Sequence, residues 1–487
     1  PRSTLFPYTT LFRSDDDAVS FNLSGRQVNI IRAFIDLGTL IVFTSGAEWK
    51  IAGDSNGVLR AGEVNPKAQS YNGSSKIQPI LINDTAIFVQ ARGSVVRDLN
   101  YELESDKYKG GDLTVFSNHL FINKEIVDWA FSQIPNSIAW IVLDDGSLLG
   151  LTYVREHQIV AWHRHDFQDG EVESVCVIPE GSEDYLYLII KRTINGSEVR
   201  YIERMASRVI DSINDSIFVD SCVTYDGRNT NANLTMTLSG SAWDYTDTLT
   251  LTASSGYFVS GDVGSEIHIT GPSGDIIRCA IIEYTSDTVV SIKPNRLVPV
   301  DMRSAAISTW SKAVKIVDGL DHLEGESVSV LADGYVVASP NNASYDEIIV
   351  AGGEVELDKC YSLIRVGLPF LSDIETLDID SPQGETIADK QKGISEATIF
   401  VESTRGLWVG PKPPSNDSED PLEYLYEKKT RNEENYDEPP ILKTGQIHLN
   451  IKSEWNSNGR IFIRQVDPLP MSVLAVLPKG HIPFTGR

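Results

Sequence analysis

Four stretches between Leu40 and Tyr201 repeat one pattern, in which an alternating run of apolar residues is followed by a short turn and a second such run. Alternation with a period of two places the apolar side chains on one face of an extended strand, so each stretch predicts a β-hairpin. Two of the turns contain Asp145-Gly146 and Asn195-Gly196. These pairs favour two-residue type I′ turns, because such turns need positive φ at both central residues.

The spacing of the hairpins constrains the fold further. They begin at residues 40, 86, 139 and 185, and this spacing of roughly 46 to 53 residues is near the length of a four-stranded propeller blade. The pattern therefore predicts a β-propeller-like region over residues 15–215. A β-sandwich or an irregular meander with accidental spacing is the alternative.

The rest of the chain also predicts short strands. At 487 residues it exceeds the size at which single cores stop growing, so several domains are expected. Residues 228–310 are rich in Thr, Ser and Gly and predict a small all-β insert, and residues 311–487 predict a C-terminal β-domain with an acidic loop at 411–440. The predicted fold class is all-β, with a partial propeller-like region followed by small β-barrel or sandwich domains. Residues 126–133 are the best candidate for a short helix.

Residues 1–14 differ in character from the rest of the chain. They have the appearance of a translated sequencing adapter, so we exclude them from the predicted fold as an artefactual segment. The sequence also begins without Met or a secretion signal. We expect the complete protein to be longer at its N-terminus.

The charge balance argues against a protein that grips nucleic acid. Lys and Arg total 42 against 68 Asp and Glu, which gives a formal net charge of −26. Tight binding to phosphates requires the opposite, a basic surface. The charge is compatible with a conduit through which DNA slides, although acidity also serves solubility.

The cysteines and the hydropathy exclude two further classes. Cys176, Cys222, Cys279 and Cys360 are widely spaced and form no CxxC pair, so neither a zinc finger nor a dense disulfide framework is expected. The longest apolar stretch, from Ile30 to Phe43, is interrupted by charges and is too short for a membrane helix. We expect no membrane partner.

Several short strings together resemble a known family. In order along Leu40 to Pro478, they are Phe43–Trp49, Asp112–Phe121, Trp140–Leu151, Trp162–His165, Lys191–Gly196, Arg200–Arg204, Tyr225–Gly227, Gly319–Gly325 and Leu331–Gly334. Each string is weak alone, but the ordered set is similar to the tail tubular protein B group of short-tailed bacteriophages and prophages. An upstream region of that family, with a Gly-Glu-Leu-Ser-Pro signature, is absent.

This resemblance implies a function. Members of the group are virion structural proteins that assemble as a ring, the nozzle that extends the tail channel below the portal. It implies a homo-oligomer, expected to be a hexamer, with other tail and portal-side proteins as partners. DNA would pass transiently without specific binding, and the protein, made in the host cytoplasm, would reside in the phage tail.

One histidine cluster is a candidate metal site. On a strand, His163 and His165 project to the same face, and with Asp166 they could hold zinc. His157 and Asp169 lie nearby in the sequence. A two-residue histidine spacing is also common on an ordinary exposed strand, and that is the interpretation we favour.

Carboxylate pairs offer a candidate catalytic site. Asp144 with Asp145, or Asp166 with Asp169, could supply the acid and the nucleophile of a glycosidase. Aspartates at turns more often accept hydrogen bonds from backbone amides. Because no phosphate-binding loop, dinucleotide fingerprint or hydrolase motif occurs either, we predict no catalytic residue and no cofactor.

Two further segments invite a functional interpretation. Gly319–Gly325 groups His322 with Glu324, but it more simply leads into a strand. Arg405–Trp408 could be a contact surface, although Trp408 is more often a core residue, as are Trp49, Trp140 and Trp162.

Three hypotheses from different classes follow. The first is a non-enzymatic subunit of a phage tail conduit. The second is a cellular β-propeller used as a binding module, and the third is a tail-associated glycan hydrolase.

Overall fold

The computed structural model describes residues 23, 29–53, 58–59, 64–210, 212–380, 386–418, 420–429, 439–452 and 454–481. The adapter-like segment 1–14 lies outside these residues. Within them the regular elements are β-strands and three-residue 3₁₀ turns, and no α-helix is present. The all-β prediction is confirmed. The one helix predicted, at residues 126–133, is wrong, because Ile126–Ser132 is strand β9.

Two compact units make up the chain. The first consists of Pro1–Asp166, Gly170–Arg192 and Val199–Met205, and the second of Phe167–Asp169, Thr193–Glu198 and Ala206–Arg487. The finer boundaries predicted at residues 215, 228 and 311 stay predictions.

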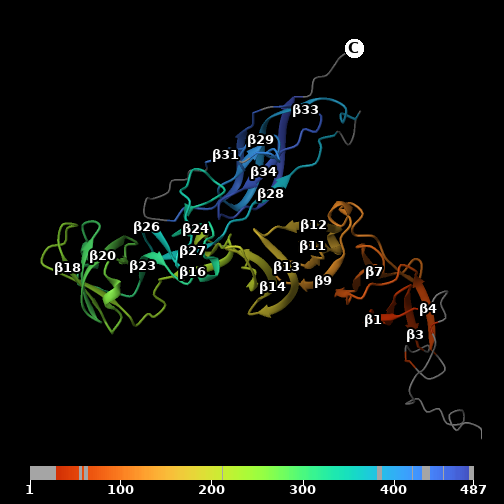
Figure 1. Ribbon diagram of the computed structural model, residues 1–487, viewed down its shortest axis with the longest axis horizontal. Helices are drawn as coiled ribbons and strands as arrows, with labels where there is room; N and C mark the ends of the chain where they lie inside the picture. The colour runs from red at the N-terminus through yellow and green to blue at the C-terminus, as the bar shows by residue number, and fades with distance from the viewer. Residues whose placement is uncertain are drawn as a thin grey trace, which may run out of the picture. The chain divides into compact units, whose positions relative to one another are not determined.

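The first unit contains successive meander sheets, in which each strand hydrogen-bonds to the next along the chain (Figure 1). This is the blade topology of β-propellers. The hairpins predicted from the alternating pattern all form within these sheets. The sheets are β1 (Ile31–Asp36) to β4 (Asn65–Ser70) through β2 (Leu40–Thr44) and β3 (Glu48–Ala52); β5 (Ile80–Ile82) to β8 (Lys107–Lys109) through β6 (Thr85–Val89) and β7 (Val96–Glu102); β9 to β12 (Ile159–His165) through β10 (Ile138–Leu143) and β11 (Leu148–Val154); and β13 (Gly170–Glu180), β14 (Glu183–Ile194) and β15 (Ser197–Arg204).

Apolar clusters join neighbouring sheets of this unit. Phe43 of β2 packs against Phe88 of β6 with ring centroids 5.0 Å apart, so the first sheet contacts the second. A second cluster joins the second and third sheets through side chains such as Ile87 and Ile141. Since alternate residues of a strand point to opposite faces, the neighbours Ile87 and Phe88 of β6 enter different clusters, and the second sheet contributes to a core on each side.

The two turns predicted from Asp-Gly and Asn-Gly differ in geometry. Asn195 and Gly196 both have positive φ, at 46° and 73°, as a type I′ turn requires. At the other hairpin only Gly146 has positive φ, at 80°, and the Leu143 N–H donates to Ser147 O across a three-residue loop. The type I′ prediction at Asp145-Gly146 is therefore wrong, and the glycine instead completes a longer turn.

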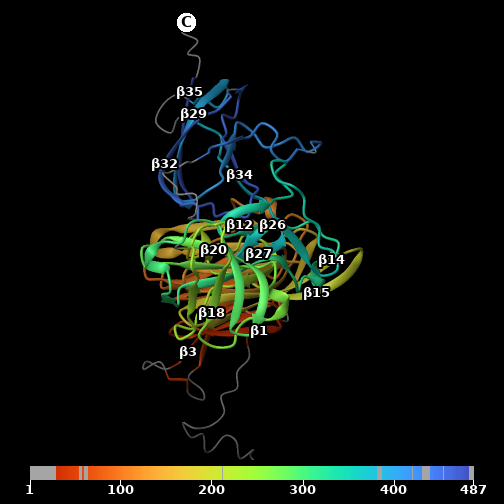
Figure 2. The same ribbon diagram turned by 90° about the vertical axis from the view of Figure 1, so that its left-hand side faces the viewer.

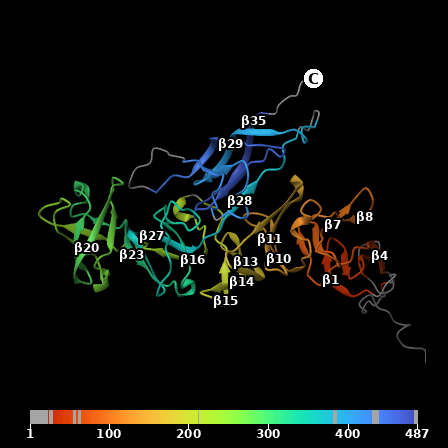
Figure 3. The ribbon, with the colours of Figure 1, turned by 45° about the horizontal axis from the view of Figure 1, so that its top comes forward.

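The second unit contains a small barrel-like sheet inserted into another sheet. Strand β16 (Asp220–Asp226) pairs with β27 (Leu363–Leu368), which lies far along the chain (Figure 3). Between them in sequence, one sheet encloses a core of buried side chains such as Leu251, Ile269 and Ile292. Its order is β22 (Ala306–Ile307), β17 (Met236–Ser239), β18 (Leu249–Ala253), β21 (Val289–Pro294), β20 (Ile276–Ser286), β19 (Glu266–Thr270), β23 (Trp310–Val317) and β26 (Val355–Tyr361). Strands β24 (Ser329–Ala332) and β25 (Tyr335–Ala338) continue the sheet of β16.

The C-terminal part is a sandwich of two sheets (Figure 2). They share a core to which Ile399, Ile447 and Ile463 contribute. The acidic loop 411–440 is described only in part, and it contains the short strand β31 (Tyr426–Glu427). The first sheet consists of β28 (Ser372–Glu375), β34 (Phe462–Gln465), β30 (Trp408–Gly410) and β31, and the second of β32 (Lys443–Asn450), β29 (Lys392–Thr404), β33 (Trp455–Asn456) and β35 (Val473–His481).

Candidate functional site

The two histidines of the proposed metal site lie together on β12. Nδ1 of His163 lies 2.8 Å from Nε2 of His165, and the rings contact each other edge-on. Both rings also contact the indole of Trp140, at centroid distances of 5.9 and 5.1 Å. The prediction that both histidines share one face of a strand is confirmed.

Gly150 makes this ring cluster possible. It lies between Trp140 and His163 in the register of β10, β11 and β12. A Cβ atom at Gly150 would overlap the imidazole of His163. The missing side chain thus leaves the space that the histidine ring fills, and the cluster is a packing arrangement built across three strands.

The remaining candidate ligands do not join the histidines. Asp166 forms an exposed ion pair with Arg164 at 2.7 Å. His157 lies outside the strand, in the 3₁₀ turn Arg155–His157 that precedes β12. Among the described residues, no group of three or more His, Cys, Asp and Glu side chains is arranged to hold a metal ion. Asp166 therefore does not complete a ligand set with the pair.

Asp144 and Asp145, the first candidate catalytic pair, both form hydrogen bonds at the β10–β11 turn. Asp144 accepts the backbone N–H of Glu125 at 2.9 Å. Asp145 accepts the Ser147 N–H at 3.1 Å and pairs with Lys124 at 2.7 Å. Partial burial pushes the pKa of Asp145 up, but these hydrogen bonds outweigh it and lower the pKa overall. A carboxylate held ionised in this way is poorly suited to donate a proton.

The second pair, Asp166 with Asp169, is not built as a catalytic pair either. Asp169 has positive φ, at 46°, and its carbonyl accepts the N–H of Thr193. It is thus a turn residue, as the sequence suggested for aspartates of this kind.

The Gly319–Gly325 segment is a connecting turn. Both carboxylate oxygens of Glu324 accept backbone N–H groups, from Gly352 at 2.9 Å and Gly353 at 2.8 Å. These backbone hydrogen bonds lower the pKa of Glu324. His322 contacts the carbonyl of Ser221 at 3.0 Å. The segment therefore ties loops together, as the simpler interpretation predicted.

The tryptophans predicted as core residues are mostly interior. Trp49 and Trp140 are buried, and Trp162 is partly buried against Phe121, with ring centroids 4.9 Å apart. Trp408 is partly buried at the start of β30. The contact-surface interpretation of Arg405–Trp408 gains no support from this burial.

Sequence reasoning missed a buried carboxylate. Glu48 of β3 is fully buried and accepts a hydrogen bond from Ser70 on β4. Burial raises the pKa of the Glu48 carboxyl, although hydrogen bonds from Ser70 and from the backbone of Asn72 and Gly73 oppose the shift. Glu48 thus fastens the chain that leaves β4. Its place in an alternating strand, next to buried Ala47 and Trp49, was the available signal.

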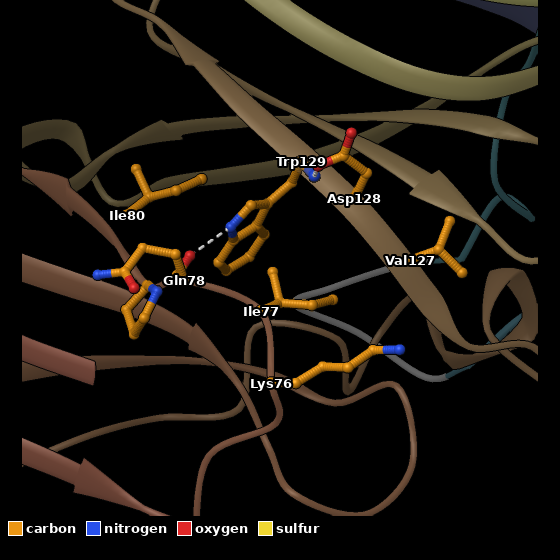
Figure 4. A pocket seen from close by; sticks show the side chains of 8 residues that line it. Lys76, Ile77, Gln78, Ile80, Val127, Asp128 and Trp129 are labelled. Atoms are coloured by element: carbon orange, nitrogen blue, oxygen red, sulfur yellow. Dashed lines mark hydrogen bonds between the residues drawn. The ribbon is translucent and has the colours of Figure 1, made fainter. Parts of the chain in front are cut away.

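A shallow surface pocket of about 430 Å³ lies between the chain entering β5 and strand β9 (Figure 4). Its floor includes Ile77 and the ring of Trp129, whose Nε1 donates to Gln78 O at 2.6 Å. Asp128, the single acid among the lining residues, accepts from Ser174 Oγ at 2.7 Å and from Val175 N at 3.1 Å. The pocket therefore lacks the two carboxylates of a glycosidase.

No family model and no curated protein matches the chain. One similar solved structure is a crystal structure from Bacteroides uniformis named "putative 6-phosphogluconolactonase", at 9% identity and a TM-score of 0.22 over 67% of this chain and 84% of that one. The fold class therefore rests on the sheet topology described above.

Proposed function

We propose that this chain is a structural subunit of the tail nozzle of a short-tailed bacteriophage, assembled as a ring that continues the DNA channel. The observation that carries the proposal is the ordered series of family-like strings between Leu40 and Pro478. Such a subunit acts through its folded surfaces, so the residues of these strings should be structural.

The positions of the strings support this proposal. Phe43–Trp49 spans the turn between β2 and β3, where Thr44 Oγ1 donates to Ala47 O at 2.6 Å. Trp140–Leu151 forms the β10–β11 hairpin, and Gly319–Gly325 ties two loops through Glu324. These three strings thus form turns and a buried hairpin, as expected of residues with a structural role.

The location of the protein in the particle tests the proposal. Antibodies raised against the insert, residues 228–310, should label the tip of the tail in intact virions of the source phage. Portal, capsid and internal virion genes should flank the coding sequence. Absence of the protein from purified particles, or a metabolic operon around the gene, would contradict the proposal and favour a cellular binding module.

A tail-associated glycan hydrolase is the competing function. Purified protein incubated with host polysaccharide should release no reducing ends. If hydrolysis occurs and is lost in Asp144→Asn or Asp166→Asn, the chain is an enzyme and the structural proposal is wrong.

A further inference from the structure

Two lysines lie directly opposite each other on the neighbouring strands β3 and β4. Lys50 is paired with Lys67 in the antiparallel register, so both side chains leave the same face of the sheet. In such pairs the Cβ atoms are roughly 4.5–5.5 Å apart, and like charges in this position destabilise the pairing of the strands. A bound anion would relieve this repulsion.

Contacts with the second sheet show what the lysine face meets. Nζ of Lys50 lies 5.6 Å from the ring centroids of both Tyr101 on β7 and Tyr108 on β8, which are themselves opposite each other. Gln69 follows Lys67 by two positions and shares its face of β4. Its Oε1 accepts the backbone N–H of Tyr108 at 2.9 Å. The lysine face of β3 and β4 therefore adjoins the tyrosine pair of β7 and β8.

No acidic side chain in the described part of the chain neutralises the two lysines. Neither Lys50 nor Lys67 forms an ion pair or a hydrogen bond through Nζ with a described residue. Glu48, two positions before Lys50, is fully buried, and burial raises the pKa of its carboxyl, which disfavours the ionised form. The repulsion between the lysines thus remains uncompensated by direct contact.

The charges of the adjoining β7–β8 hairpin are engaged among themselves. Glu102 pairs with Lys109, and Asp106 accepts the hydroxyl of Tyr101 at 2.7 Å. The charged residues between Val96 and Lys109 are Arg97, Asp98, Glu102, Glu104, Asp106, Lys107 and Lys109. These four acids and three bases sum to −1, and Lys50 and Lys67 bring the described residues of both hairpins to +1, or to zero if Glu48 is ionised. The surroundings are therefore not acidic, although the whole chain carries −26.

Two neighbouring ammonium groups match the chemistry of a phosphate group. Each lysine offers three N–H donors and a compact positive charge. A phosphate monoester carries a charge of roughly −1.5 to −2 at neutral pH and several acceptor oxygens, so it can accept hydrogen bonds from both lysines at once. A single carboxylate would offset only one of the two charges.

We propose that Lys50 and Lys67 bind a phosphate group beside Tyr101 and Tyr108. The site lies within one subunit, so the inference goes beyond the proposed function and does not depend on the ring. The group can belong to free phosphate or to a nucleotide. A nucleotide base would stack on the ring of Tyr101, which is 42% exposed.

Calorimetry of the full chain with inorganic phosphate, at constant ionic strength, tests the site. The thermal midpoint of the wild type should rise by roughly 3–6 °C at a phosphate concentration about tenfold above Kd. The matched control is Lys76→Met, which removes an exposed lysine of the same unit that lies outside the site. K76M should respond to phosphate like the wild type.

Two substitutions of Lys67 give a result that a merely structural role would not produce. Without phosphate, Lys67→Met should not lower the midpoint, because it removes the repulsion with Lys50. Lys67→Glu should raise the midpoint, because a carboxylate then lies opposite Lys50. Both variants should lose the response to phosphate, and their circular dichroism should match that of the wild type.

Titration calorimetry with adenosine monophosphate identifies the source of the phosphate group. A Kd at least roughly tenfold below that of inorganic phosphate supports a nucleotide, and equal values support free phosphate. No phosphate response in the wild type would overturn the inference. So would equal responses in the wild type, K67M and K67E, because a general salt effect acts on every variant alike.

Discussion

Glu48 shows how one buried residue can make stability depend on pH. Burial raises the pKa of its carboxyl in the folded protein, while the pKa in the unfolded chain stays near its ordinary value. The folded state therefore binds the proton more tightly. The contribution of Glu48 to the free energy of unfolding is fully present below the pKa that its carboxyl has in the unfolded chain. This contribution is lost as the pH rises through the pKa of the folded protein.

We expect Glu48→Gln to remove this dependence. The amide keeps polar contacts toward Ser70 but cannot ionise, so the free energy of unfolding should fall less between pH 4.5 and pH 7 than in the wild type. Urea unfolding at several pH values measures this free energy. Glu402→Gln, at an exposed position of β29, is the control and should follow the wild type. An equal pH slope in E48Q and the wild type would mean that Glu48 is not the source.

Gly150 gives a second prediction at the scale of a residue. Gly150→Ala forces a methyl group into the imidazole of His163 and should destabilise the first unit by about 1–3 kcal/mol, the usual cost of overpacking. Gly261→Ala, where a Cβ meets nothing and φ is not positive, is the control. Thermal unfolding followed by near-ultraviolet circular dichroism would detect the loss of Trp140 packing. Equal midpoints for the two variants would contradict the proposed crowding.

For single residues, the sequence predicted which side chains share a face of a strand better than it predicted their burial and their partners. The common face of His163 and His165 follows from the strand period alone. The engagement of Asp166 with Arg164, and the burial of Glu48 beneath the chain after β4, depend on which segments meet in three dimensions. Local patterns do not contain that information.

Elements were predictable where pattern and turn chemistry agreed. The alternating runs gave the hairpins, and Asn195-Gly196 gave the turn type. Ile126–Ser132 was mistaken for a helix because its apolar residues suit either period over so short a run. Its identity as a strand is determined by pairing with β10. The three-residue loop at Asp144–Gly146 likewise depends on the register of β10 with β11.

The buried ion pair between Arg192 of β14 and Glu203 of β15 leads to another prediction. Arg192→Met removes the buried guanidinium that pairs with Glu203 and should destabilise the first unit by about 3–5 kcal/mol. The double variant Arg192→Met/Glu203→Leu should recover most of this loss, because no charge remains buried. Chemical denaturation of the monomer measures the free energy of unfolding of both variants.

The matched control for this pair is an exposed one. Lys479→Met breaks the exposed pair with Glu396 and should have no measurable effect. If R192M is as stable as K479M, the buried pair does not hold the two strands together.

At the scale of the whole molecule, the charge of −26 bears on how strongly the proposed channel would bind DNA. Contacts to successive phosphates add up and must all be broken for the duplex to move, so a conduit should bind DNA weakly. Filter binding of duplex DNA to assembled rings at low salt should show no affinity at micromolar concentrations. Micromolar or tighter binding that weakens steeply with salt would mean that basic residues line the channel.

The ring itself is the central claim, and electron microscopy of the full-length protein tests it most directly. The protein should be imaged alone and mixed with its portal-side tail partner, over a range of concentrations. We expect closed cyclic particles, six-fold by family resemblance, with a central channel wide enough for duplex DNA. Monomers alone under every condition, or open filaments without closure, would contradict the account.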